Sequence, residues 1–552
     1  MNDNMSALKK IMLLFLLYAS MLSCRKSQLN IINPNAPTAF SLTSENGIYD
    51  FALGIVNKQF GQVQNAGYIN LFVIALTQHS IMGDELFSPY GNFGFRWANQ
   101  VYSIQPSTRS TPVINPIGKT QLSTLQSYNK REAGESNVFL YEWNFAYNYI
   151  TQCNQLLAAL NNDKLTFSGS PSEVSTKKAV LRSWAYWWKG YAYSRIGSVY
   201  LAGLIVNDAG ITTNNYISHD AIIEEANNNL DLAIASLESI GGSSSIYKST
   251  MQAITASYNS PEKLIDPLMW IHNINTLKAR NIIANTKNSE MSLADWDEII
   301  ALTQNGISES DNVFVQGMTI DGKNDVAGGF FHPYILLGTT QEFTFVSERL
   351  IQEFYEDDHR LAENFVMNGV YPPNIRGRGL QFGTRWTVKN IEDGGNFATN
   401  NNQGTISIAA TFEENELMKA EALINTGHIE EGLRIVDQIR AFQHAGIPEV
   451  SNTGLNIEQA NSELRRERRV ALFMRGTAFY DARRWGLTKP IVEGGGRNDA
   501  VVYLPVNYLE SGSASPDVRL SVMDYNYVDY FDVPANEFDF NIPSVISVPI
   551  KN

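Results

Sequence analysis

The sequence has few of the residues that carry out chemistry. Its 552 residues include two cysteines and seven histidines, and no HExxH, G-x-S-x-G, P-loop or CxxC pattern occurs in it. These absences remove the local signatures of zinc peptidases, serine hydrolases, phosphate-loop enzymes and dithiol sites. We therefore predict no catalytic residue, no cofactor and no metal ligand set. Calcium binding by oxygen ligands of acidic loops is the one kind of metal site that the sequence does not exclude.

A positive charge excess and a membrane-spanning run are also absent. The chain has 42 Lys and Arg against 56 Asp and Glu, a formal net charge of -14. Such a balance argues against binding of nucleic acid or anionic lipid through bulk charge. The apolar run at residues 11–22 is shorter than the ~20 residues of a spanning helix. Because Lys9 and Lys10 precede this run, we predict a secretory signal peptide over residues 1–23.

Cys24 is predicted to carry a lipid. The residues Met21-Leu22-Ser23 before it resemble a lipobox, which would make Cys24 the first mature residue. Each buried CH₂ of an acyl chain contributes ~0.8 kcal/mol, so several chains hold a protein on a membrane. An ordinary cleaved signal with an incidental cysteine is the alternative. The other cysteine, Cys153, lies in a helical pattern and is predicted to be a small core residue.

Apolar residues recur at helical spacing along most of the chain. In residues 413–441 one helical pattern stops at Gly427, and a second begins with Ile429 and continues through Leu433 and Val436. Such a pair buries its apolar faces only by stacking on neighbouring pairs, as in TPR repeats. We therefore predict a mostly α protein, a TPR-like scaffold of helix hairpins with long irregular loops and minor β-hairpins. Other helical patterns cover residues 45–86, 138–160, 177–200, 220–237 and 277–306.

Arginine is concentrated in one stretch, residues 461–486. Three acidic residues accompany seven arginines there, so the stretch has an excess of positive charge within an acidic chain. Arginine engages carboxylates bidentately and packs its stem as hydrocarbon. We therefore favour a half-buried structural clamp over an anion site. The candidate partners are four acidic residues of an earlier helical pattern: Glu413, Glu414, Glu416 and Glu421.

The same stretch resembles a known family signature. The residues that carry the resemblance are Glu467, Arg468, Arg469, Asp481, Arg483, Arg484 and Trp485. With them the stretch is similar to the C-terminal signature of the SusD/RagB family, although Ala471, Arg475 and Ala478 depart from it. The resemblance implies an outer-membrane lipoprotein of Bacteroidetes that captures nutrients, usually glycans, for a TonB-dependent transporter. It also implies a scaffold of TPR-like helix pairs, in which the signature is architectural and not catalytic.

The predicted division of the chain has four parts. The signal peptide (1–23) and a lipid-anchored tether (24–45) precede a SusD-like N-terminal helical region at 46–270, which includes an aromatic loop at 84–117. A SusD/RagB-type C-terminal region follows at 271–552. We expect these two regions to form one compact structural unit.

The aromatic loop is the predicted ligand-binding element. Sugars are bound by aromatic faces together with carboxylate, amide and guanidinium groups, and the corresponding loop of the family often contributes to the ligand surface. Some rings of the loop are expected to attach it to the body of the protein. The candidates are Asp84, Tyr90, Arg96, Trp97 and Asn99, with a second contribution from Phe331 and Tyr334.

Three functions fit the sequence. The one we favour is a non-enzymatic, lipid-anchored protein, exposed on the outer membrane, that binds an oligosaccharide or another nutrient and works with a SusC-like TonB-dependent transporter. The second is a secreted helical glycoside hydrolase, which would release reducing ends from a glycan. The third is a periplasmic TPR-type adaptor that binds peptides, which protease treatment of intact cells would not reach.

Overall fold

The computed structural model describes residues 41–60, 71–255, 264–318, 344–367, 369, 378–388, 392–393, 396–397 and 404–552. The predictions for the signal peptide, for lipidation of Cys24, and for Phe331 and Tyr334 concern residues outside these ranges. Within the described ranges, no helix is both long enough and apolar enough to cross a membrane.

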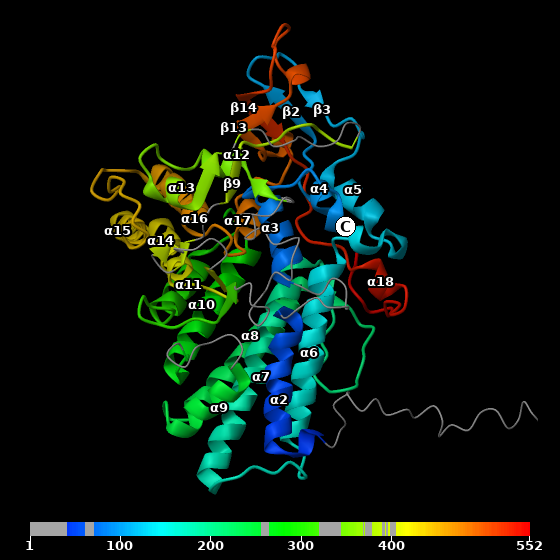
Figure 1. The fold of residues 1–552 in the computed structure, drawn as a ribbon, viewed down its shortest axis with the longest axis vertical. Coiled ribbons are helices and arrows are strands. Elements are labelled where there is room, and N and C mark those ends of the chain that lie inside the picture. Colours follow the sequence, from blue (N-terminus) through cyan, green and yellow to red (C-terminus); the bar gives the residue numbers. More distant parts are fainter. Residues whose placement is uncertain are drawn as a thin grey trace, which may run out of the picture.

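Long helices run side by side through one half of the molecule (Figure 1). They are α2 (Glu45–Phe60), α6 (Leu140–Leu160), α7 (Pro171–Val199) and α8 (His219–Glu238), and α9 (Ser245–Thr255) contacts α2 and α7. Local sequence signals determine where α7 begins. Ser170 and Glu173 form a capping box, and Pro171 occupies the first helical position, where its missing N–H is not needed.

Glycines of α7 allow it to pack closely against α8. A Cβ atom at Gly190 would lie 2.7 Å from Cγ of Leu230, and one at Gly197 would lie 2.7 Å from Cγ1 of Ile223. Because Cβ atoms essentially never approach other atoms this closely, a larger residue at either position would push the two helices apart.

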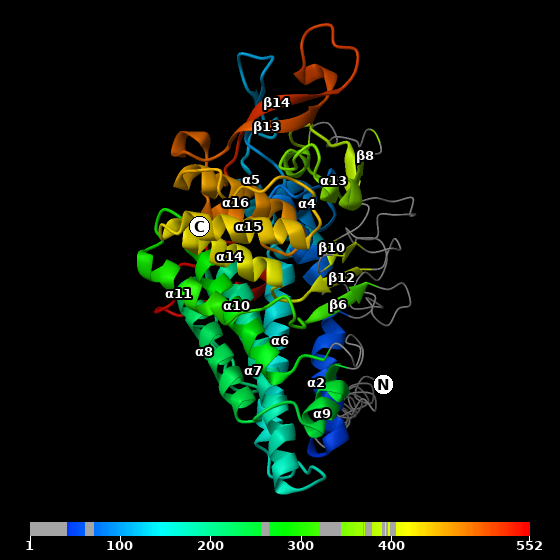
Figure 2. The ribbon, with the colours of Figure 1, turned by 90° about the vertical axis from the view of Figure 1, so that its left-hand side faces the viewer.

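A layer of helix hairpins flanks the long helices (Figure 2). Its members are α10 (Pro267–Asn285), α11 (Leu293–Gln304), α14 (Phe412–Asn425), α15 (Ile429–Phe442) and α16 (Ile457–Ala471). α14 and α15 form the hairpin predicted at residues 413–441, and Gly427 between them has a left-handed φ of 92°. α8 contacts α10, α10 contacts α11, α11 contacts α14, and α16 contacts both α14 and α15. This succession confirms the predicted mostly α, TPR-like scaffold.

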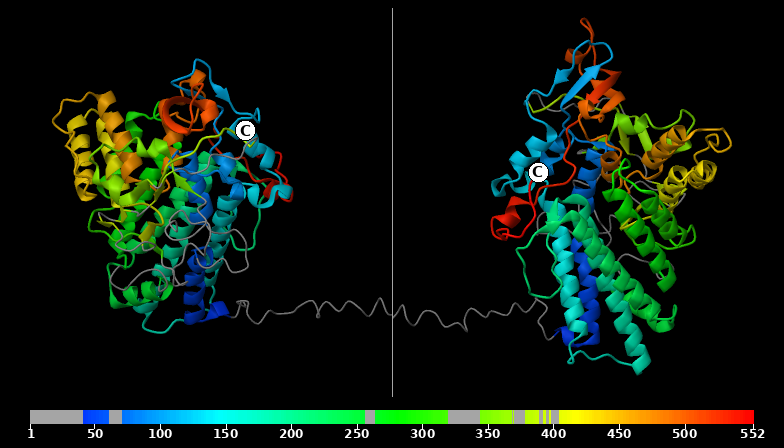
Figure 3. Two further views of the ribbon diagram at one scale, coloured as in Figure 1. Left: turned by 45° about the horizontal axis from the view of Figure 1, so that its top comes forward. Right: turned by 180° about the vertical axis from the view of Figure 1, so that it is seen from behind.

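Small antiparallel sheets complete the fold. One has the strand order β13-β14-β2-β3 and another has the order β1-β7-β9-β8. In the first sheet, β2 (Ser103–Pro106) of the aromatic loop pairs with β14 (Asp517–Asp524) of the C-terminal part, at one end of the molecule (Figures 1 and 3). The other strands are β1 (Leu86–Phe87), β3 (Val113–Ile114), β4 (Ala202–Gly203), β5 (Ile217–Ser218), β6 (Val315–Met318), β7 (Phe345–Val346), β8 (Phe365–Met367), β9 (Trp386–Val388), β10 (Glu392–Asp393), β11 (Asn396–Phe397), β12 (Gly404–Ser407) and β13 (Arg497–Leu504).

Short helices connect these elements, and the end of α3 (Thr77–Met82) changes one predicted boundary. The helical pattern predicted over residues 45–86 ends at Met82, and Leu86 lies in β1, because Asp84 adopts a left-handed φ of 61° that stops the helix. The short helices are η2 (Ser41–Thr43), η3 (Leu71–Leu76), α3 (Thr77–Met82), η4 (Asn92–Gly94), α4 (Phe95–Ala98), α5 (Gln121–Tyr128), η5 (Arg131–Ser136), α12 (Glu348–Ile351), α13 (His359–Asn364), α17 (Ala478–Arg484), η7 (Ile491–Glu493), η8 (Val506–Tyr508) and α18 (Ala535–Phe538).

Aromatic side chains fill the core between α7 and α10. Trp184, Trp187 and Trp270 are fully buried, and each of their rings lies against the ring of Phe314. Cys153 of α6 is buried in the same core as a free thiol, which confirms its prediction as a small core residue. Burial raises the pKa of this thiol, so the group is inert at neutral pH.

Candidate functional site

A buried carboxylate fixes the start of the aromatic loop. Asp84 is 6% exposed and follows α3. Its Oδ1 accepts a hydrogen bond from Nε of Arg349 (3.2 Å), and its Oδ2 accepts from Nε of Arg497 (3.1 Å) and from the hydroxyl of Tyr525 (2.6 Å). Burial alone would raise the pKa of Asp84, but these three partners outweigh it and hold the pKa at about 2. The ion pairs of Asp84 therefore fix the backbone where the aromatic loop leaves α3.

The neighbouring carboxyl group, Glu85, is buried in a different environment. Its Oε2 atom has no hydrogen-bond donor among the described residues. Burial raises the pKa of Glu85 to about 7, although a hydrogen bond from Ser80 and the charge of Arg469 oppose the shift. Two acidic residues adjacent in sequence therefore differ in charge over the mildly acidic range.

Replacing Glu85 with glutamine is expected to remove a loss of stability with rising pH. A carboxyl group whose folded pKa is raised from 4.5 to about 7 binds more protons in the folded state, so wild-type stability falls as pH rises through that window. The free energy of unfolding of Glu85→Gln relative to wild type should rise by about 3 kcal/mol between pH 4.5 and 8. Urea denaturation at both pH values measures this. A difference that does not change with pH would contradict it.

Trp97 and Tyr128 form a partly exposed aromatic platform. Trp97 lies in α4, and Tyr128 is the last residue of α5. Their ring centroids are 5.2 Å apart and their planes differ by 23°, which is a stacked arrangement. The guanidinium carbon of Arg96 lies 5.5 Å from the centroid of the Trp97 ring. Ring faces beside a hydrogen-bond donor are suited to the C–H surface and hydroxyl groups of a sugar.

A latch joins the aromatic loop to a segment of the second half of the chain. Oε1 of Gln100 accepts hydrogen bonds from the amide of Leu380 (3.0 Å) and from Nδ2 of Asn115 (3.3 Å). A Cβ atom at Gly379 would lie 1.9 Å from the same oxygen, so the approach requires glycine. This latch fixes the backbone beside Arg378, whose side chain is exposed.

A cleft of about 470 Å³ borders the latch. Its volume is within the ~300–1,000 Å³ of typical small-molecule sites. Apolar walls and a few amide and hydroxyl groups give it the composition of a small-molecule site. The residues that line it are Val113, Ile114, Pro116, Gly379, Gln381, Asn507 and Tyr508.

The five predicted loop residues lie in different environments. Asp84 and Asn99 are buried, and Asn99 donates to a main-chain carbonyl of its own loop (2.8 Å). Arg96 is 4% exposed, and its Nε also donates to a carbonyl of the loop (2.9 Å). Tyr90 and Trp97 are partly exposed. Asp84 and Asn99 therefore hold the loop in shape, while Tyr90 and Trp97 reach the surface.

The arginine-rich stretch forms a clamp. Arg468 of α16 donates to both carboxylate oxygens of Asp481 in α17 (3.0 and 3.1 Å). Arg484 donates to Asp481 (2.7 Å) and to both oxygens of Glu421 in α14 (2.7 and 2.6 Å). Burial of Glu421 would raise its pKa, but the arginines hold it at about 2. Glu421 is thus a partner that the sequence predicted correctly.

The other three predicted partners bind outside the stretch. Glu414 pairs with Arg280 of α10, Glu416 pairs with Lys419 of its own helix (2.6 Å), and Glu413 accepts from a glutamine side chain (3.4 Å). The prediction was wrong for these three, because residues at different positions along one helix point in different directions.

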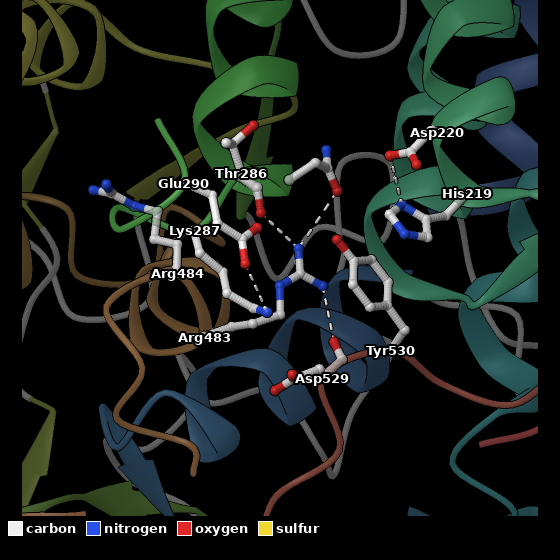
Figure 4. A pocket seen from close by; sticks show the side chains of 11 residues that line it. His219, Asp220, Thr286, Lys287, Glu290, Arg483, Arg484, Asp529 and Tyr530 are labelled. Atoms are coloured by element: carbon white, nitrogen blue, oxygen red, sulfur yellow. Dashed lines mark hydrogen bonds and ion pairs between the residues drawn. The ribbon is translucent and has the colours of Figure 1, made fainter. Parts of the chain in front are cut away.

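Arg483 lines a pocket of about 250 Å³ (Figure 4). Its guanidinium donates to the main-chain carbonyls of Asp529 (2.9 Å) and Ala284 (2.6 Å) and lies 4.2 Å from the ring centroid of Tyr530. The ring of His219 stacks on the ring of Tyr530, with the centroids 4.1 Å apart. Because its donors are directed at the main chain, Arg483 connects the C-terminal segment to α10 and does not present its charge to a ligand.

Arg469 connects the clamp to the aromatic loop. Its guanidinium donates to the carbonyls of Gly83 (2.9 Å), Asp84 (3.2 Å) and Arg349 (3.1 Å). Trp485, the last signature residue, lies beside the clamp, with the guanidinium of Arg484 4.9 Å from its ring centroid. Arg469 is therefore the signature residue that supports the aromatic loop directly.

Three residues of the site were not predicted from the sequence: Gln100, Tyr128 and Arg378. Gln100 belongs to the aromatic loop, whereas the other two approach it from separate segments. Together the site offers ring faces, guanidinium groups and amides, which bind and orient a ligand. Among the described residues, no group of three or more His, Cys, Asp or Glu side chains is arranged to hold a metal ion.

Comparison with known proteins gives one family match and several structures with the same fold. Residues 414–544 match the family model described as the SusD family. A SusD-like carbohydrate binding protein from Bacteroides vulgatus is 14% identical, with a TM-score of 0.57 over 92% of this chain and 98% of that one. A SusD-like protein from Bacteroides fragilis is 14% identical, with a TM-score of 0.55 over 93% and 99%. Surface glycan-binding protein A from Bacteroides thetaiotaomicron is 13% identical, with a TM-score of 0.53 over 91% and 98%.

No curated protein matches the sequence. At 12–14% identity these likenesses establish a shared fold, and the family match covers the clamp and the C-terminal strands. The resemblance carried by the arginine-rich stretch is confirmed, because residues 414–544 match the SusD family model and the fold is shared with SusD-like proteins.

Proposed function

We propose that this protein binds an oligosaccharide at the outer membrane and delivers it to a TonB-dependent transporter without breaking bonds in it. The observation that carries the proposal is the stacked, partly exposed pair of Trp97 and Tyr128 at the surface of a SusD-like fold. Two proteins with the same fold have names that state carbohydrate or glycan binding.

The rest of the site supports binding of a sugar more than chemistry on one. Hydrolysis of a glycoside requires two carboxylates facing each other across a cleft, about 5–10 Å apart. Asp84 of the aromatic loop is instead paired with Arg349 and Arg497, and its neighbour Glu85 is buried. Incubation with candidate glycans should therefore release no reducing ends. Release would favour the glycoside hydrolase.

Replacing Trp97 with alanine is expected to weaken glycan binding about 10- to 100-fold, because burying a large ring face under a ligand contributes about 1.5–3 kcal/mol. The melting temperature should change little, since the ring is already partly exposed. Calorimetric titration with a glycan that binds the wild type measures the effect. Phe167→Ala removes another partly exposed ring and should bind like the wild type. Equal affinities for Trp97→Ala and wild type would contradict the site.

Anchoring through an acylated Cys24 completes the proposal. A protein held at the cell surface by this lipid should be removed by protease treatment of intact cells, and Cys24→Ala should release it from the membrane. Purification from solubilised outer membrane should recover a TonB-dependent transporter with the wild type. Recovery of neither a transporter nor a glycan, together with protection from protease, would favour the periplasmic adaptor.

A further inference from the structure

The candidate site contains a buried arginine, Arg96, that has no carboxylate partner among the described residues. Arg96 is 4% exposed, and its hydrogen-bond partner is a neutral carbonyl of its own loop (2.9 Å). Among the described residues, no carboxylate pairs with it. A buried cation is normally paired with an anion, because its desolvation is unfavourable. Arg484 of the clamp follows this rule with two carboxylate partners, and Arg483, which has none within the described chain, has its guanidinium covered by three main-chain carbonyls.

A second unpaired cation lies beside the first. Arg378 is exposed, and within the described chain it likewise has no carboxylate partner. The latch between Gln100 and Leu380 fixes the backbone two residues from Arg378 against the aromatic loop. The latch therefore places Arg378 on the same side of the site as Arg96, and burial, followed by the charge of Arg378, lowers the pKa of Arg96.

We propose that the glycan bound at Trp97 and Tyr128 is acidic, and that its anionic group binds at Arg378 in the field of Arg96. This inference rests on the proposed function, because it specifies the ligand class of the same site. Guanidinium groups bind carboxylate and sulfate oxygens bidentately, whereas a neutral sugar would leave both charges unmatched.

Titration of three oligosaccharides tests the proposal: an oligogalacturonate that carries carboxylates, a carrageenan oligosaccharide that carries sulfates, and neutral maltohexaose. At least one acidic probe should bind the wild type more tightly than maltohexaose. Arg378→Gln should weaken that binding about tenfold, the size of one charge-assisted contact. The control Arg434→Gln, which changes an exposed arginine of α15, should have no effect. The preferred acidic probe distinguishes a carboxylate from a sulfate.

A second measurement separates the charge from the fold. Raising the salt concentration should weaken binding of the acidic probe to the wild type and have less effect on Arg378→Gln. If maltohexaose binds as tightly as both acidic probes and Arg378→Gln changes nothing, the inference is wrong while the proposed function stands. If none of the three probes binds the wild type, so that Trp97→Ala cannot weaken binding, both the proposed function and this inference are contradicted.

Discussion

Replacing Glu467 with alanine should lower the free energy of unfolding by about 3–5 kcal/mol, as expected when one partner of a buried ion pair is removed. Glu467 is 1% exposed, and its two oxygens accept from Nη1 of Arg360 (2.5 Å) and from Nε of Arg440 (2.9 Å). Both arginines are buried. Without the carboxylate, each would lose a charged partner that water cannot replace.

Glu463 provides a matched control for this prediction. It lies one helical turn earlier in α16 and also pairs with Arg440 (2.9 Å), but it is partly exposed. Glu463→Ala should therefore cost about 1 kcal/mol or less. Urea denaturation of both variants gives the comparison. Equal losses of stability would mean that Glu467 does not anchor the clamp.

Replacing Asp84 with asparagine is the second large expected effect, about 3–5 kcal/mol of stability at pH 7. Asparagine tolerates the left-handed φ of 61° at this position, so the backbone is preserved and the loss reports the charge. Arg349 would remain buried, and Arg497 half-buried, without their shared anion. Retention of wild-type stability would show that the start of the aromatic loop is not held electrostatically.

The pH dependence of this variant has a definite sign. The folded pKa of Asp84 is depressed from 3.8 to about 2. Its contribution to stability is therefore complete above pH 4 and is lost as pH falls through 2. The stability difference between wild type and Asp84→Asn should shrink by about 2 kcal/mol over that window. Glu421 titrates in the same range, but it is present in both proteins and cancels from the difference.

The helical scaffold could be predicted from the sequence because it depends on local patterns. Gly427 and the apolar spacing after Ile429 locate the α14–α15 hairpin within the chain. The clamp was predicted in part, because an excess of arginine requires acidic partners. The particular partner depends on which side of α14 faces α16 and α17, and only Glu421 among the four candidates faces that way.

The candidate site could be predicted only where it lies within one segment. The aromatic loop contains Trp97, but Tyr128, which stacks on it, belongs to α5. Arg378 belongs to a third segment, which the hydrogen bond between Gln100 and Leu380 holds against the loop. Nothing in the local sequence of these segments indicates that they meet. Asp84 is a polar residue of the loop and was predicted to bind ligand, but its carboxylate is directed at Arg497 and Tyr525 of the distant C-terminal part.

Hydrogen–deuterium exchange with and without the tightest-binding oligosaccharide tests the central claim, that a passive helical scaffold presents a ligand site on the aromatic loop. Slower exchange should appear in residues 88–102 and 120–128, while α14, α15 and α16 should exchange as before. Protection confined to those three helices, with the aromatic loop unchanged, would contradict the account.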